Sequence, residues 1–158
     1  MKKLIILLVI LFSGAAANAQ FNVGVSAGLP SGDFSEAYSL SVHLDASYLT
    51  EVSDDFLVGG TTGLLYTLGD TVGPIEFEDL GYVPVAAAAR YVISEKITTG
   101  ADVGYALGIA PSGAEGGFYY APKAQYNFSD NLSAVLAYRS VSNNGSLSFL
   151  TLGVELKL

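Results

Sequence analysis

The chain of 158 residues contains no cysteine, one histidine and few charged residues. Without cysteine there can be no disulfide framework and no thiolate nucleophile or metal ligand, and one histidine excludes any site built from several histidines. Charged residues make up 14% and hydrophobic residues 51%, the opposite of the composition typical of disordered chains. Only 7 Lys and Arg stand against 15 Asp and Glu, so we expect no nucleic-acid partner, because phosphate recognition needs a basic surface.

The first nineteen residues have the pattern of a secretory signal peptide. Lys2 and Lys3 form a positive start, Leu4 to Phe12 is an unbroken apolar run, and Ala17-Asn18-Ala19 fits the small-x-small cleavage rule. The apolar run is too short to cross a bilayer as a helix, which takes about 20 residues. We therefore predict a signal peptide over 1–19, cut before Gln20, and one domain over 20–158. Beyond it, the longest apolar run, Val83 to Ala89, is interrupted by Pro84, so no membrane-spanning helix is expected.

Apolar and polar residues alternate through the rest of the chain, the period-2 pattern of β-strands. In Phe21 to Leu29, for example, Phe, Val, Val, Ala and Leu alternate with Asn, Gly, Ser and Gly. The pattern divides the chain into eight segments, each about as long as a tilted strand that crosses a bilayer. The eight predicted strands are Phe21–Leu29, Tyr38–Tyr48, Phe56–Thr67, Leu80–Ile93, Ile97–Ala110, Gly117–Phe128, Leu132–Val141 and Leu147–Leu158.

The connections between these strands alternate in length. Short ones centre on Ser53, Ser94 and Ser129, each within a weak repeat of apolar, Ser, acidic, polar and apolar residues. The others, 30–37, 68–79, 111–116 and 142–146, are mostly longer and rich in Gly and Pro. Short turns on one side and longer loops on the other are typical of an up-and-down outer-membrane barrel. The sequence therefore predicts an all-β fold, an eight-stranded antiparallel up-and-down transmembrane β-barrel.

Charges avoid one face of every predicted strand. Counting alternate positions places the apolar side chains on one face, and the other face carries His43, Asp45, Arg90, Asp102, Lys123, Arg139, Glu155 and Lys157. A soluble barrel would need the reverse, with charges facing water. A few balanced charges suit a closed interior, and an apolar exterior suits lipid. Aromatic residues gather at both strand ends, as expected at two membrane interfaces.

The sequence resembles the small outer-membrane β-barrels of Gram-negative bacteria with OmpA/OmpX-type architecture, and more narrowly the outer-membrane β-barrel domain widespread in Bacteroidetes. The resemblance rests on Asn18-Ala19-Gln20, Phe21 to Val25, Leu29 to Ser35 and the terminal strand Leu150 to Leu158. It implies insertion by the outer-membrane assembly machinery and contact with outer-membrane lipid. Members often end in an aromatic residue, whereas this chain ends in Leu158. The family implies no single function.

We expect a lumen charge network of Asp45, Arg90, Asp102, Lys123, Arg139 and Glu155, with His43 beside it. If these charges pair, Arg90→Ala should lower the unfolding midpoint by stranding a buried carboxylate. Ser41, His43 and Asp45 share a face and offer an enzymatic alternative, a lipid-modifying site. Residues two apart on a strand lie about 7 Å apart, so direct hydrogen bonds of a catalytic triad are not expected among them.

Seven acidic residues in the long loops have no Lys or Arg among them. They are Asp33, Glu36, Asp70, Glu76, Glu78, Asp79 and Glu115. One hypothesis is that these carboxylates bind divalent cations that bridge them to lipopolysaccharide phosphates or to a partner surface. The favoured hypothesis is that the loops are simply solvated and that their like charges repel one another, which keeps the surface soluble.

The favoured function is a non-catalytic structural or surface-interaction role in the outer membrane, with no cofactor, no metal site and an unidentified external ligand. The alternatives are a narrow pore for small solutes and the lipid-modifying enzyme. The interior of an eight-stranded barrel is just wide enough for side chains to fill, which disfavours the pore.

Overall fold

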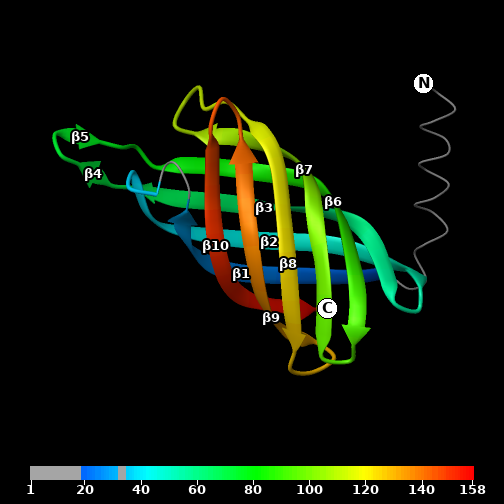
Figure 1. The fold of residues 1–158 in the computed structure, drawn as a ribbon. Helices are drawn as coiled ribbons and strands as arrows, with labels where there is room; N and C mark the ends of the chain where they lie inside the picture. The colour runs from blue at the N-terminus through cyan, green and yellow to red at the C-terminus, as the bar shows by residue number, and fades with distance from the viewer. Residues whose placement is uncertain (1–18, 32–34) are drawn as a thin grey trace, which may run out of the picture.

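The computed structural model describes residues 19–31 and 35–158 and shows a closed antiparallel barrel of eight strands (Figure 1). The barrel strands are β1 (Ala19–Ser31), β2 (Tyr38–Ser53), β3 (Phe56–Gly69), β6 (Leu80–Ser94), β7 (Ile97–Ala110), β8 (Gly117–Asn127), β9 (Leu132–Ser142) and β10 (Ser146–Lys157). The predicted fold class is confirmed, and every predicted strand appears within a few residues of its expected ends. The predicted signal peptide lies outside the described residues, apart from Ala19.

Neighbouring strands in the chain pair in antiparallel fashion, and β1 pairs with β10 to close the barrel. The closing register runs from Asn22 opposite Lys157 to Ser31 opposite Ser148. Closure matters because an open sheet edge would leave backbone N–H and C=O groups without partners in lipid. Among the described residues there is no helix long and apolar enough to span a membrane.

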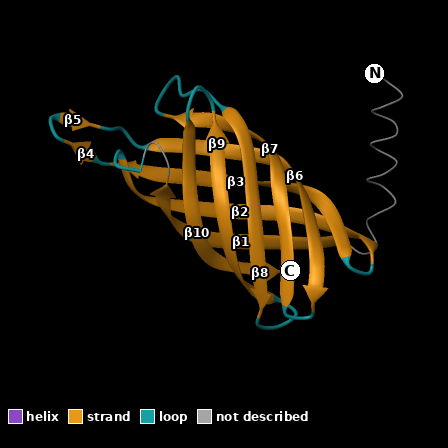
Figure 2. Ribbon diagram, viewed as in Figure 1, coloured by secondary structure: helices purple, strands orange, loops and turns teal. Residues whose placement is uncertain are grey.

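Both ends of the described chain lie at the short-turn end of the barrel. The amide of Leu158 donates to the carbonyl of Phe21 (2.9 Å), and Figure 2 shows the short turns between β2 and β3, β6 and β7, and β8 and β9. The longer loops lie at the opposite end, here called the long-loop end. The alternation of connection lengths therefore reflects the up-and-down topology.

The long connection predicted at 68–79 contains two further short strands, which were not predicted from the sequence. β4 (Thr71–Val72) pairs with β5 (Ile75–Glu76) in a hairpin that projects beyond the barrel (Figure 1). Its turn, Gly73-Pro74, has Gly73 at a φ of +63°. A type II′ turn, which suits a two-residue hairpin, has a glycine with positive φ at its first central position and a negative φ, such as that of proline, at its second.

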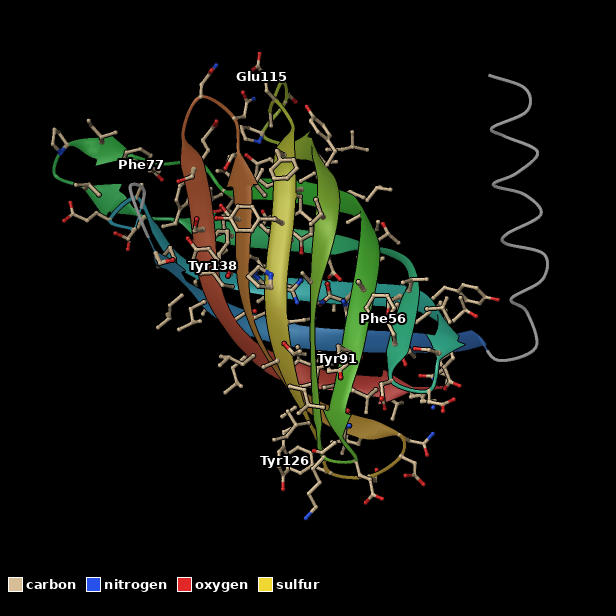
Figure 3. The ribbon with its side chains drawn as sticks, turned by 45° about the vertical axis from the view of Figure 1, so that its right-hand side comes forward. Phe56, Phe77, Tyr91, Glu115, Tyr126 and Tyr138 are labelled. Atoms are coloured by element: carbon tan, nitrogen blue, oxygen red, sulfur yellow. The ribbon has the colours of Figure 1, made fainter. Side chains whose placement is uncertain are left out.

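Large apolar side chains cover the outside of the barrel. Leu29, Val85, Leu107, Leu150 and Leu152 each expose more than half of their surface. Figure 3 shows Phe56, Tyr91 and Tyr126 toward the short-turn end, with Phe77 and Glu115 at the other. Tyr38, an aromatic residue expected to face the membrane interface at the long-loop end, instead packs against the interior cluster. A register shift lies between Tyr38 and Ser41, and the Tyr38 ring also packs edge-to-face on Phe77.

Candidate functional site in the barrel lumen

The lumen is filled in layers, and a layer of ion pairs lies near its middle. Asp102 on β7 forms ion pairs with two cations: its Oδ1 is 2.7 Å from Nη1 of Arg90 on β6, and its Oδ2 is 2.7 Å from Nζ of Lys123 on β8. All three side chains are at most 2% exposed. Charges this deep are tolerated only when paired, and strict alternation on three neighbouring strands places them side by side.

A second ion pair crosses the lumen between β2 and β9. Nη1 and Nη2 of Arg139 each lie 2.7 Å from an oxygen of Asp45, a bidentate arrangement. The remaining Arg139 donors reach the Thr151 hydroxyl (3.2 Å), the Tyr119 hydroxyl (3.4 Å) and the Ser26 hydroxyl (3.4 Å). This guanidinium therefore links strands from several sides of the barrel.

The predicted network is divided rather than continuous. Glu155 accepts a hydrogen bond from Nε2 of Gln125 (2.7 Å) and forms no ion pair with a basic residue in the part of the chain that the structure describes. Asp102 keeps a second cation when Arg90 is lost, so Arg90→Ala would not strand it; the expected reason for that variant's instability is therefore wrong. Asp45 is the carboxylate that depends on a single arginine.

His43 and Ser41 are in direct contact, contrary to the expectation from strand spacing. His43 Nε2 lies 2.9 Å from Ser41 Oγ, because the long imidazole leans along the strand. The Ser41 hydroxyl is also placed to donate to the Gly28 carbonyl (3.1 Å), and the imidazole tautomer decides which atom donates in the contact with His43. A catalytic triad would also need an acid bonded to the imidazole. Asp45 bonds to Arg139, and both Ser41 and His43 are buried.

An apolar plug fills the lumen at the long-loop end, and sequence reasoning missed it. Its core includes Leu65, Tyr82, Tyr119, Leu147 and Phe149, all buried, and the Phe149 ring packs edge-to-face on His43. The signal was available: these positions share the strand parity of the lumen charges, for example Tyr119 with Lys123 on β8. Locating the charges on the inward face does not reveal the apolar residues that share it.

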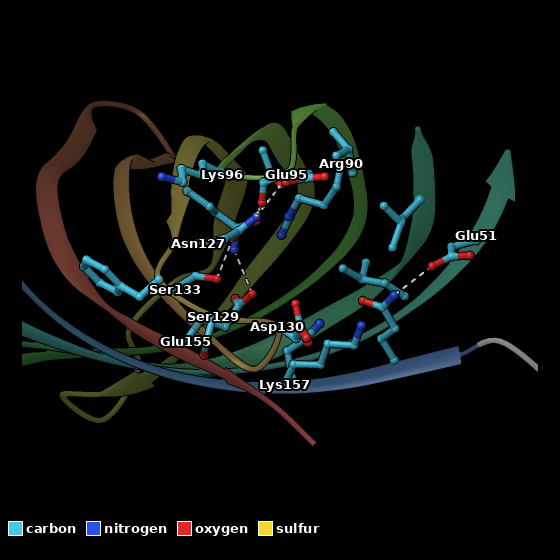
Figure 4. Close-up of a pocket in the computed structure, with 18 of the residues that line it drawn as sticks. Glu51, Arg90, Glu95, Lys96, Asn127, Ser129, Asp130, Ser133, Glu155 and Lys157 are labelled. Carbon is cyan, nitrogen blue, oxygen red and sulfur yellow. Dashed lines mark hydrogen bonds between the residues drawn. The ribbon is translucent and has the colours of Figure 1, made fainter. Parts of the chain in front are cut away.

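The short-turn end is open, and it holds a cavity of about 490 Å³, here called the vestibule. Arg90 and Gln125 lie among its lining residues, Leu49, Leu57 and Val92 form an apolar wall, and Lys96 and Lys157 are basic residues in its lining. Figure 4 shows the Arg90 side chain reaching into this space from β6. The lumen is thus a vestibule, a charged middle and a closed plug, in that order.

The loop acids are spread over several elements. Asp79 accepts from the Gly69 amide (2.9 Å) and the Tyr66 hydroxyl (2.8 Å), Asp70 from the Thr71 amide (2.7 Å), and Glu115 from the Asn143 amide (3.1 Å). Glu36, Glu76 and Glu78 are exposed; Asp33 lies outside the described residues. Among described residues no three His, Asp or Glu gather to hold a metal, so cation bridging has no preformed site there.

The closed eight-stranded barrel with charges inside and apolar residues outside is the fold of small outer-membrane β-barrels. It is similar to Ail, the attachment invasion locus protein of Yersinia pestis (TM-score 0.61, 16% identity, 89% of this chain and 97% of that one). It is also similar to the N-terminal barrel of Pseudomonas aeruginosa OprF (0.53, 12%, 89% and 100%) and to Neisserial surface protein A (0.51, 12%, 89% and 97%). No protein-family model and no curated protein sequence matches the chain.

Proposed function

We propose that this chain is an integral outer-membrane protein with a structural or surface-interaction role and without catalysis. The observation that carries the proposal is its inverted distribution of side chains. Arg90, Asp102 and Arg139 are at most 2% exposed, whereas Leu29 and Leu152 are 65% and 64% exposed. Such a surface is unstable in water and suits hydrocarbon, and a barrel satisfies its backbone groups there.

The surface role rests on the long-loop end. The β4–β5 hairpin projects there with Glu76 exposed, and the described loop residues include no Lys or Arg. Ail has been solved in complex with the heparin analogue sucrose octasulfate. A polyanion of that kind suits basic loops, so it is an unfavourable ligand for this chain. The acidic loops favour a basic partner surface, or lipopolysaccharide phosphates bridged by free divalent cations.

Fractionation of cells that express the full chain, with unheated and boiled samples run on one gel, tests the proposed location. We expect the protein in the outer membrane, with a band that shifts on boiling, because a folded barrel resists detergent. Recovery from the soluble periplasm without a shift would contradict the proposal. The proposal includes insertion by the outer-membrane assembly machinery and removal of residues 1–19. The mass of the membrane-bound protein tests the cleavage.

The plug makes a pore the weaker alternative. An enzyme is also the weaker alternative, because Ser41 and His43 are buried and Asp45 is bonded to Arg139 rather than to His43. Single-channel recording in planar bilayers should show no stepwise conductance. Lipid A and phospholipid acylation should not change on overexpression.

A further inference from the structure

Beyond the structural role, we propose that the floor of the vestibule binds the carboxylate of a small organic anion with a short apolar tail. Arg90 supplies the main contact. Its Nη1 is occupied by Asp102 and by the carbonyls of Ala89 (2.8 Å) and Ala101 (3.3 Å). Its Nε and Nη2 are buried and have no hydrogen-bond partner in the described structure.

The two unpaired nitrogens form one edge of the guanidinium. Nε–H and the adjacent N–H of Nη2 point in parallel, which matches the two oxygens of a carboxylate. Leaving both donors buried and unpaired costs free energy, and an anion would remove that cost. The vestibule lining as a whole carries five acidic and three basic residues, so the attraction for an anion is confined to the neighbourhood of Arg90, where Arg90 and Lys123 share the single carboxylate of Asp102.

The vestibule supplies room and an apolar wall. Its volume of about 490 Å³ lies in the range of small-molecule sites. Leu49, Leu57 and Ala88 form a buried cluster with Val92 packed on it, and β6 places Arg90 between Ala88 and Val92. A ligand whose carboxylate meets Arg90 can therefore lay a short alkyl chain on this wall. The two free nitrogens have almost no exposed surface, so binding requires the Arg90 side chain or its neighbours to shift and open this edge to the vestibule.

The chain offers a direct test, because Arg90 and Arg139 are its two arginines. In the folded barrel in lipid nanodiscs, labelled with ¹⁵N, each contributes one Nε–H signal. We expect the Arg90 signal to shift and saturate as hexanoate is added at constant ionic strength. The Arg139 signal, whose Nε–H donates to Thr151, should stay in place. Acetate should bind at least about tenfold more weakly, because it lacks the apolar tail.

Arg90→Lys keeps the charge beside Asp102 but lacks the two-donor edge. Binding to this variant is measured from the NMR signal of the Gly100 backbone amide, because Gly100 is the register partner of Arg90. We expect the variant to bind hexanoate at least about tenfold more weakly than the unaltered chain. The matched control, Lys96→Gln with Lys157→Gln, removes two charges from the vestibule lining but keeps the two-donor edge, so it should weaken binding far less than Arg90→Lys does. The proposal is overturned if hexanoate causes no saturable shift at Arg90, if acetate binds equally well, or if Arg90→Lys binds like the unaltered chain.

Discussion

Replacing Arg139 with methionine should destabilise the barrel more than the same change at Arg90, although both guanidinium groups are 2% exposed. Arg139→Met leaves the Asp45 carboxylate without its one ion-pair partner. Removing one member of a buried pair costs 3–5 kcal/mol, and the Asp45 side chain is 13% exposed, so we expect about 3 kcal/mol. Arg90→Met leaves Asp102 paired with Lys123, so we expect a smaller cost of about 1.5 kcal/mol, from the lost ion pair with Asp102 and the lost hydrogen bonds to two backbone carbonyls.

Equilibrium unfolding in lipid vesicles, followed by far-ultraviolet circular dichroism, measures both costs. The chain has no tryptophan, so a fluorescence readout would be weak. Lys96→Met, on the exposed short turn, is the control and should change stability by less than about 0.5 kcal/mol. Pairing Arg139→Met with Asp45→Leu should recover most of the loss, because an apolar pair has no stranded charge. The reasoning is refuted if Arg139→Met costs no more than Arg90→Met, or if the double variant is as unstable as the single one.

Two further predictions concern the outer surface and the loops. Leu152 is 64% exposed on the outer face, and Leu152→Arg near the membrane midplane should cost about 2–4 kcal/mol of stability in lipid. Ile75→Arg on the projecting hairpin should cost almost nothing. Equal effects of the two variants in vesicle unfolding would contradict the lipid-facing assignment. Hydrogen bonds from the Gly69 amide and, to a smaller extent, from the Tyr66 hydroxyl lower the pKa of the Asp79 carboxyl. These two bonds should therefore stabilise the loop fully above about pH 4, and the stabilisation should be lost as pH falls through the lowered pKa of Asp79. Carboxyl NMR should show this titration, and Asp79→Asn should speed hydrogen exchange of the Gly69 amide; an ordinary Asp79 pKa would sink the idea.

The barrel could be predicted from the sequence because lipid imposes a rule that period-2 counting detects. Each strand must show apolar residues to hydrocarbon at every second position, as Val103, Tyr105, Leu107 and Ile109 do along β7. The same counting identified the residues that face the lumen. It could not say which of them pair, because pairing depends on side-chain length and strand stagger. Arg139 thus reaches Asp45 across β1 and β10, while Glu155 meets Gln125.

Counting by face also hides differences along the barrel axis. Tyr119 and Lys123 share a face of β8, yet one belongs to the apolar plug and the other to the charged layer. The β4–β5 hairpin was missed because its strands are only two residues long, although Gly73-Pro74 between β-branched residues is a hairpin signal. The contact between Ser41 and His43 was missed because backbone spacing ignores the reach of an imidazole.

The division of the lumen separates two places where this chain can meet other molecules. The plug around Phe149, which is fully buried, closes the long-loop end, and the Asp45–Arg139 pair closes the middle. If the proposed non-conducting role is right, a solute in the vestibule does not reach the loops through the barrel, and a partner on the hairpin does not contact Arg90. Changes at the loops should then leave the vestibule unaffected unless they disturb the strands themselves, because sites far apart without shared partners behave additively. In this proposal the filled lumen serves as a scaffold, and other molecules bind at its two ends.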